Sequence, residues 1–385
     1  MHYLLRKYSD LGVSAEISIF ESSGKVNEFQ VMLHVHLPVT GFIQQLEPMA
    51  AALQKLLSDQ DLKGAQIVSA RCFLSDNANQ QKLASMLFTD KLDCTINFVK
   101  QPPLDGSKIA LWLQLFTSVQ TGNDGLPFYE HNGYQHYHTI NYKGYKGTEV
   151  NSYHQTLELL EIYESQLKER GCTIENDCIR TWFFMRDVDS DYQGFVEARK
   201  KNFFENRLTN DTHYIASTGI EGSTADYKVK VLKEAYAIKG LDEGQVKFLY
   251  AKDHLSPTYD YGVTFERGVQ VDFGDRRRVY ISGTASIDNK GNILFPGDIE
   301  GQIRRTWENV EALLSEAECS FSDLSQMIVY LRDTSDYNIV KKMFEDKFPS
   351  IPKIIVLAPI CRPGWLIEME CIAVKCIKNN RFRDL

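Results

Sequence analysis

The chain has 385 residues, a length that predicts two or three structural units rather than one domain. Hydrophobic residues make up 43% and charged residues 24%, which excludes disordered and low-complexity proteins. The formal net charge is −8, and no basic stripe is longer than Arg276-Arg277-Arg278, so we expect no nucleic-acid partner.

The eight cysteines occur without C-x-x-C spacing, which predicts reduced thiols rather than a disulfide scaffold. The first ten residues are polar and charged and do not resemble a signal peptide. No run of 18 apolar residues occurs, so we expect no membrane association. Together these features predict a cytoplasmic protein.

One pattern occurs three times along the chain. An amphipathic helix, with apolar residues three and four positions apart, is followed by a short apolar strand, an aspartate and a second helix. The first helices are expected at residues 42–56, 153–167 and 299–314, and the aspartates are Asp76, Asp187 and Asp333. The spacing from Leu57, Leu167 and Leu314 to these aspartates is 19, 20 and 19 residues, a constancy that favours triplication over chance.

A further strand is expected after each second helix, at residues 109–116, 227–232 and 366–372. Each unit would then combine a sheet with two helices, which is an α+β fold. Turn-forming residues at 121–125 and 253–257 interrupt the apolar periodicity. We therefore expect modules at 1–122, 123–254 and 255–385.

Residues 262–375 resemble the reactive-intermediate deaminase family, known as RidA, YjgF or endoribonuclease L-PSP-like. Residues 280–285, YISGTA, stand where that family has a strand ending in an SGQ turn, and residues 368–373, EMECIA, resemble its closing EIEAIA strand. The resemblance implies a chorismate-mutase-like sheet backed by two helices, assembled as a trimer with ligand sites in the clefts between subunits. Three such modules in one chain would form an intrachain pseudo-trimer, a monomer that mimics a trimer. The first two modules match the family less well.

A narrower resemblance is to the chorismatase branch of the same superfamily. Residues 360–368, ICRPGWLIE, residues 282–287, SGTASI, and the segment Arg180-Thr181-Trp182 carry it. It implies that the closing-strand glutamate, Glu368, handles the proton. It also implies that Cys361, seven residues earlier, directs the reaction, because a cysteine at that spacing does so in a subgroup that forms a hydroxybenzoate.

The strand expected at 365–374 places Glu368 and Glu370 on one otherwise apolar face, because side chains alternate along a strand. Burial and a neighbouring carboxylate both raise the pKa of a carboxyl group. A glutamate that stays protonated near neutral pH is a general acid. We predict that Glu368 is this acid, although the pattern leaves open which glutamate faces the cleft and whether an arginine pairs with it instead.

Three basic residues are candidate anchors for substrate carboxylates. Arg180 lies in an apolar strand, so it needs a carboxylate partner from the substrate or from the protein. Lys353 falls where the deaminases carry an arginine that grips the substrate. Arg362 is a further candidate anchor, or a surface ion-pair partner.

Smaller groups complete the predicted site. Ser282, Gly283 and Thr284 either bind an oxyanion through backbone N–H groups and a hydroxyl or form an ordinary turn. A cation beside Cys361 would lower the pKa of its thiol, whereas simple burial would leave it inert.

The pairs His34 and His36 and His136 and His138 each share a strand face, but no third ligand completes a metal set. No phosphate-binding fingerprint is present, so we expect neither a metal nor a nucleotide cofactor.

Three functions remain open. The first is a chorismatase-like enzyme that cleaves the enolpyruvyl ether of chorismate, or of a related small carboxylate, and releases pyruvate. The second is an enamine or imine deaminase, and the third is a non-catalytic protein that binds a small carboxylate.

Overall fold

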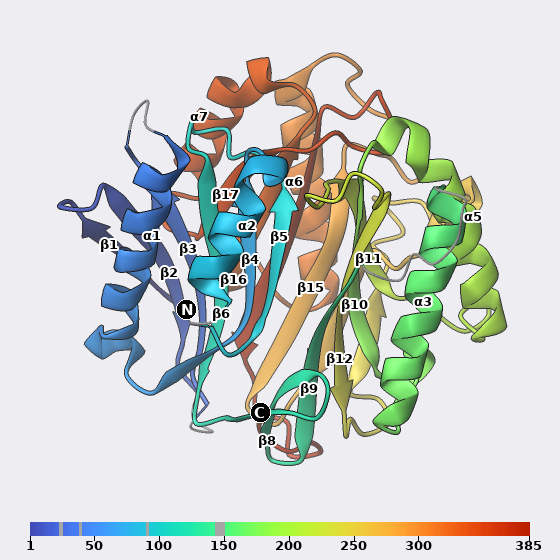
Figure 1. The fold of residues 1–385 in the computed structure, drawn as a ribbon. Coiled ribbons are helices and arrows are strands. Elements are labelled where there is room, and N and C mark those ends of the chain that lie inside the picture. The colour runs from blue at the N-terminus through green and yellow to red at the C-terminus, as the bar shows by residue number, and fades with distance from the viewer. Residues whose placement is uncertain (23–25, 38–40, 90–91, 143–150) are drawn as a thin grey trace.

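The structure is a computed structural model that describes residues 1–22, 26–37, 41–89, 92–142 and 151–385. Three six-stranded mixed sheets follow one another along the chain, each with its own helices (Figure 1). The expected α+β fold of three tandem sheet-and-helix modules is confirmed. Within the described residues, no helix is long and apolar enough to cross a membrane.

The three modules share one chain order and one sheet order. The first contains β1 (His2–Tyr8), β2 (Val13–Phe20), β3 (Glu28–Val35), α1 (Phe42–Leu57), η1 (Gln60–Leu62), β4 (Ala65–Leu74), α2 (Asn77–Phe88), β5 (Thr95–Lys100) and β6 (Ile109–Thr117). The second contains β7 (Gln120–Asn123), β8 (Pro127–His131), β9 (Tyr134–Asn141), α3 (Ser152–Glu169), α4 (Ile174–Asp177), β10 (Cys178–Met185), α5 (Val188–Glu205), β11 (Ala216–Glu221) and β12 (Val231–Lys239). The third contains β13 (Val246–Leu249), η2 (Thr258–Tyr261), β14 (Gly268–Asp272), β15 (Arg276–Ala285), α6 (Ile299–Glu316), η3 (Phe321–Asp323), β16 (Leu324–Leu331), η4 (Thr334–Asp336), α7 (Tyr337–Lys347), β17 (Lys353–Leu357) and β18 (Ile367–Cys376).

The sheet orders are β1-β2-β3-β6-β4-β5, β7-β8-β9-β12-β10-β11 and β13-β14-β15-β18-β16-β17. The last strand of each module is therefore inserted between the third strand and the strand after the first long helix. In the third module this places β18, which carries Glu368 and Glu370, in the middle of the sheet.

The repeated aspartate has a local structural cause. Asp76, Asp187 and Asp333 each occupy the N-cap position of the helical segment that follows a strand. The Asp187 carboxylate accepts a hydrogen bond from the backbone N–H of Ser190, and Asp333 accepts one from Ser335. Such caps satisfy N–H groups that have no partner inside a helix, so the repeat marks a strand-to-helix turn.

The module boundaries differ from the expected ones. Strands β7 and β13 pair with β8 and β14, so they belong to the second and third sheets, although the expected second range begins at the last residue of β7 and the expected third range begins after β13. Of the turn-forming residues 121–125, residues 121–123 belong to β7 and residues 124–125 to the turn before β8, and residues 253–257 lie inside the third module. The expected strand at 227–232 begins only at Val231.

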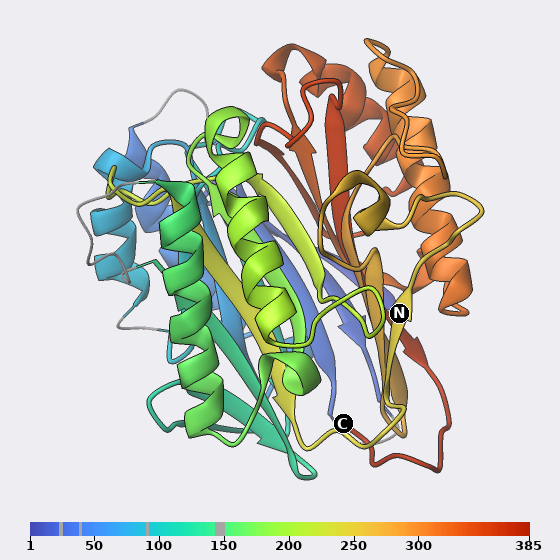
Figure 2. The same ribbon diagram turned by 90° about the vertical axis from the view of Figure 1, so that its right-hand side faces the viewer.

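The helices of all three modules lie on the outside and the sheets face one another (Figures 1 and 2). All eight residues of β10 and all eight of β16 are buried, because helices cover one face of the sheet and the other modules cover the other.

We name the contacts between modules the first–second, second–third and third–first seams. Hydrogen bonds cross each of them: Thr95 Oγ1 to the His138 carbonyl (2.7 Å), the Ser217 N–H to Ser282 Oγ (2.9 Å) and the Leu104 N–H to the Ile355 carbonyl (3.0 Å). Each module therefore contacts both of the others, and the ring is closed within one chain.

Candidate active site

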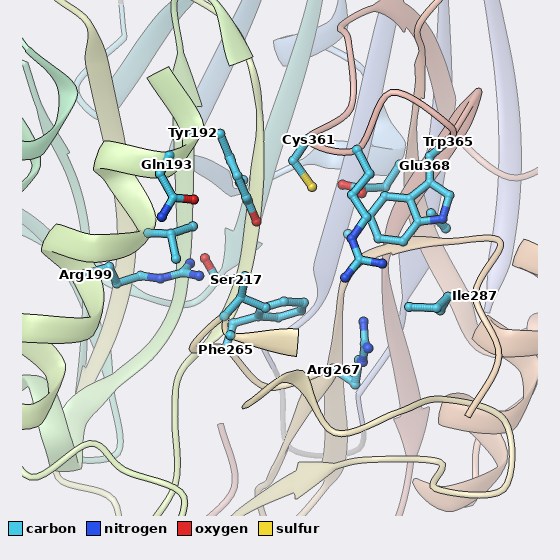
Figure 3. A pocket seen from close by; sticks show the side chains of 17 residues that line it. Tyr192, Gln193, Arg199, Ser217, Phe265, Arg267, Ile287, Cys361, Trp365 and Glu368 are labelled. Carbon is cyan, nitrogen blue, oxygen red and sulfur yellow. The ribbon is translucent and has the colours of Figure 1, made fainter. Parts of the chain in front are cut away.

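The second–third seam contains a cavity of about 280 Å³ (Figure 3). One wall comes from α5 and β11 of the second module. The other comes from residues 262–267, from the end of β15 and from residues 361–368 of the third module. The cavity therefore exists only where two modules meet.

Glu368 lies in the cavity wall, although its side chain is almost entirely buried. No hydrogen bond from the described residues reaches its carboxyl group. Burial and, next, the nearby Glu370 raise the pKa of Glu368 to about 8, and Arg180 and Arg267 offset this only in part. Glu368 is therefore predominantly a neutral acid at pH 7, and it is the glutamate that faces the cleft.

Glu370, two residues further along β18, has the opposite environment. Its carboxylate accepts hydrogen bonds from Arg180 Nη2 (2.9 Å), Trp182 Nε1 (2.9 Å) and the Thr218 hydroxyl (2.5 Å). All three donors come from the second module, so Glu370 joins the two modules.

The predicted role of Arg180 as a substrate anchor is therefore not supported. Arg180 is 1% exposed and does not line the cavity; its carboxylate partner is Glu370. The sequence allowed either a substrate or a protein partner, and the structure provides the protein one.

Lys353 also lies elsewhere. Its side chain belongs to the third–first seam, where Nζ donates hydrogen bonds to the backbone carbonyls of Phe348 (3.0 Å) and Ile351 (3.4 Å). The prediction that it grips a substrate beside Glu368 is wrong for this cavity, because β17 faces the first module. In the second–third seam, Ser217 of β11 occupies the position that Lys353 occupies on β17.

Of the predicted turn, only Gly283 reaches the cavity. The Ser282 hydroxyl donates to the Glu266 carbonyl (2.6 Å) and accepts the Ser217 N–H, and the Thr284 hydroxyl donates to the Ser282 carbonyl (2.8 Å). The predicted oxyanion role of Ser282 and Thr284 is therefore not supported, because the Ser282 hydroxyl bonds across the seam and the Thr284 hydroxyl bonds within its own strand.

Gly283 has a different role from the predicted one. Its N–H donates to Thr218 Oγ1 (2.9 Å), so it is not directed at a ligand. A Cβ atom at this position would collide with Glu368 Oε1 and lie 2.8 Å from Glu368 Cδ. The absence of a side chain therefore makes room for the Glu368 carboxyl group.

Cys361 lies beside Glu368 in the cavity wall, and Tyr192 of α5 points toward the same space (Figure 3). Burial and, next, Glu368 raise the pKa of the Cys361 thiol to about 12. Of the two alternatives that the sequence left open, burial outweighs the effect of the Arg362 cation. Cys361 therefore presents a neutral S–H group to the cavity.

Arg362 lines the cavity. Its Nη1 donates to the Gly291 carbonyl (3.1 Å), and its guanidinium lies 4.9 Å from the centre of the Trp365 ring. These contacts orient a cation at the cavity wall next to an aromatic side chain.

Two further arginines were missed in the sequence. Arg199 enters from α5 and Arg267 from the segment before β14, on different sides of the cavity (Figure 3). Both are buried; Arg199 Nε donates to Thr264 Oγ1 (3.2 Å) and Arg267 Nη2 to the Ser256 carbonyl (2.9 Å). Arg199 lies on the same helical face as Tyr192 and Val196, three and four positions apart along α5. This spacing could have identified Arg199 from the sequence.

The site thus combines a neutral carboxyl group, a neutral thiol and arginines from two modules. Guanidinium groups recognise carboxylates, and a buried neutral acid donates a proton. The arrangement fits acid–base chemistry on a small anionic ligand.

A family model described as endoribonuclease L-PSP matches residues 265–375. A RutC family protein of Pyrococcus abyssi is 32% identical over 99 residues, which cover 25% of this chain and 78% of that protein. The 2-iminobutanoate/2-iminopropanoate deaminase of Mus musculus is 29% identical over 113 residues, which cover 29% of this chain and 81% of that protein.

A solved structure has a similar fold over most of this chain. The crystal structure of a chorismatase matches 82% of this chain and 95% of its own, with a TM-score of 0.64 and 16% sequence identity. At this identity the likeness shows a shared fold. Fold and cavity together define a fused, three-module relative of the small Rid-type proteins. The chain belongs to the RidA/YjgF (endoribonuclease L-PSP) superfamily.

Proposed function

We propose that this protein is a chorismatase-like enzyme that cleaves the enolpyruvyl ether of chorismate or of a closely related small carboxylate. The observation that carries the proposal is the neutral Glu368 carboxyl group, with a pKa of about 8, in a seam cavity that arginines line. The likeness of the whole ring to a chorismatase supports it.

The reaction needs one proton donor and one water molecule. Glu368 donates its proton to the terminal methylene carbon of the enolpyruvyl group, and the ether carbon becomes an oxocarbenium ion. Water adds to that carbon and its proton returns to the Glu368 carboxylate. The hemiketal then collapses, which releases pyruvate and leaves the ring oxygen as a hydroxyl.

The other cavity residues bind and orient the substrate. Arg199, Arg267 and Arg362 supply positive charge for the two carboxylates of chorismate. Trp365 and Phe265 supply apolar walls for the ring. Cys361 lies beside the acid and influences which product the ring forms. Because one chain supplies both walls of the cavity, we propose that a monomer is active.

Incubation with chorismate, with pyruvate measured by a coupled lactate dehydrogenase assay, tests the proposal. We expect steady pyruvate release that falls by roughly 10²–10⁴-fold in Glu368→Gln, the usual contribution of a general acid. Glu300→Gln, which removes an exposed carboxylate on α6, is the matched control and retains activity. Equal rates for wild type and Glu368→Gln would reject the proposal.

The second candidate is an imine deaminase, which the 29% identity over 113 residues to the mouse deaminase favours. Generating 2-aminoacrylate in situ and measuring ammonia release tests it. The position of Lys353 in another seam argues against this function. Stabilisation by small carboxylates without turnover of either substrate would instead indicate a binding protein.

A further inference from the structure

The third–first seam contains a second cavity, of about 210 Å³, which the proposed reaction does not use. The first module contributes Glu16 from β2, His34 from β3, His36 just after β3, and Asp105 from the connection between β5 and β6. Helix α7 and strand β17 form the opposite wall. The histidine pair noted in the sequence thus lies at an interface between modules.

Hydrogen-bond acceptors outnumber donors in this cavity. Glu16 Oε2 accepts the Lys353 backbone N–H (3.0 Å) and Asp105 Oδ1 accepts the Ser107 N–H (2.9 Å). Among the described residues, no hydrogen bond reaches Glu16 Oε1 or Asp105 Oδ2. The Lys353 ammonium is turned toward backbone carbonyls, so it does not satisfy these oxygens.

His34 lies between the two carboxylates. Its Nε2 is 3.7 Å from Glu16 Oε2 and its Nδ1 is 3.9 Å from Asp105 Oδ2, distances too long for hydrogen bonds. Nε2 is buried and has no hydrogen-bond partner among the described residues. His34 therefore leaves acceptor oxygens of both acids without a hydrogen-bond donor from the described residues, and both acids line the adjoining cavity.

The other groups around His34 do not replace that donor. His36 Nε2 is 2.7 Å from the Ser14 hydroxyl, and Lys341 pairs with Glu345 at the rim (3.9 Å). Burial lowers the pKa of His34, but Glu16 and then Asp105 raise it above its ordinary value, while Lys353 opposes them. The two flanking acids therefore favour the protonated form of His34.

We propose that the third–first cavity binds a small primary ammonium compound, which contacts Glu16 and Asp105 and displaces the proton of His34. A primary ammonium group has three N–H donors and no acceptor, which matches the excess of acceptors. An anion would face the carboxylates of Glu16, Asp105 and Glu345. Among the described residues, no three His, Cys, Asp or Glu side chains are grouped to hold a metal ion.

The binding is coupled to pH. When His34 is protonated, its charge already neutralises the carboxylates, and an added ammonium ion is repelled. As the pH rises through the pKa of His34, the affinity for the amine increases and the number of protons released per bound amine decreases. Burial raises the pKa of Glu16, but the nearby His34 and Lys353 together lower it below its ordinary value, so Glu16 stays charged throughout.

Thermal unfolding and titration calorimetry with n-propylammonium chloride test the proposal on the full chain. We expect saturable stabilisation that is larger near pH 8 than near pH 6, and a heat of binding near pH 6 that depends on the buffer's ionisation enthalpy. Asp105→Asn and Glu16→Gln should each weaken binding by at least about tenfold, whereas Glu47→Gln, which changes an exposed carboxylate on α1, should not. His34→Gln should bind with little pH dependence, which keeps the test valid if an acid variant fails to fold.

Sodium propionate, tetramethylammonium chloride and magnesium chloride are the comparison ligands. Stabilisation by propionate would identify an anion site, and stabilisation by magnesium without propylammonium would identify a metal site; either result overturns the proposal. Equal stabilisation by tetramethylammonium, which has no N–H donor, overturns it as well. So does equal stabilisation of wild type and Asp105→Asn by propylammonium.

Discussion

The closing strands of the second and third modules, β12 and β18, have the same place in their sheets but different chemistry. Strand register equates Glu370 with Glu234, and both carboxylates pair with arginines of another module: Glu370 with Arg180, and Glu234 with Arg71. By the same strand register, Glu368 corresponds to Leu232 in the second module and to Ala110 in the first. The structural acid is thus repeated, whereas the cavity-facing acid occurs only in the third module.

The seams differ accordingly. A cavity of the first–second seam, where Trp112, Trp182 and Arg71 pack together, measures about 30 Å³, against about 280 Å³ for the cavity beside Glu368. Burial of a carboxyl group without a charge partner disfavours its ionised form. The three modules thus share one architecture. The proposed chemistry is confined to one seam, because only there does a cavity lie next to the Glu368 carboxyl group.

The largest effect is expected when Glu368 of β18 is replaced by leucine, the residue at the corresponding position of β12. Glu368→Leu should lower pyruvate release from chorismate by at least roughly 100-fold, because the proton donor is lost. The midpoint of thermal unfolding should not fall, because an apolar side chain replaces a buried acid without a hydrogen bond. Activity that survives in Glu368→Leu would show that another group donates the proton.

Changing the structural acid should affect stability instead. Glu370→Ala should reduce the free energy of unfolding by roughly 3–5 kcal/mol, because it leaves Arg180 buried without its partner. Denaturant unfolding measures this loss. If the Glu370→Ala and Glu368→Leu variants had the same free energy of unfolding, Glu370 would not be the carboxyl group that stabilises the seam.

Gly283→Ala should displace the Glu368 carboxyl group. We expect a destabilisation of about 1–3 kcal/mol together with reduced turnover, because the new Cβ would collide with Glu368. Gly219→Ala is the control in the same cavity, since its Cβ would lie 3.4 Å or more from its neighbours. Equal effects of the two substitutions would mean that Gly283 does not position Glu368.

The smallest effect is the pH dependence. Activity should fall as the pH rises through about 8, because only protonated Glu368 donates. The same raised pKa stabilises the fold at low pH, and this contribution is lost as the pH rises through about 8. Glu368→Gln should remove that loss in thermal unfolding measured from about pH 6 to pH 9. An unchanged stability profile in Glu368→Gln would contradict the raised pKa.

Much of the fold could be predicted from the sequence because its signals are local. Helical stripes, capping aspartates such as Asp187 and the alternation around Glu368 depend on nearby residues. The module boundaries were misplaced because a hairpin turn and a linker use the same residue types, as at residues 121–125.

The anchors could not be predicted because they depend on how the ring closes. Arg180 meets Glu370, 190 residues away in sequence, and Lys353 faces the first module rather than Glu368. Arg267 has no periodic signal, whereas Arg199 stands at a helical position that points inward. Contacts across a seam become visible only once all three modules are placed.

Difference infrared spectroscopy of wild type against Glu368→Gln tests the central claim most directly, because it detects the C=O stretch of a protonated carboxyl group. We predict one protonated carboxyl band at pH 7 that depends on Glu368 and disappears with a midpoint near pH 8. A carboxylate band for Glu368 already at about pH 6 would contradict the account.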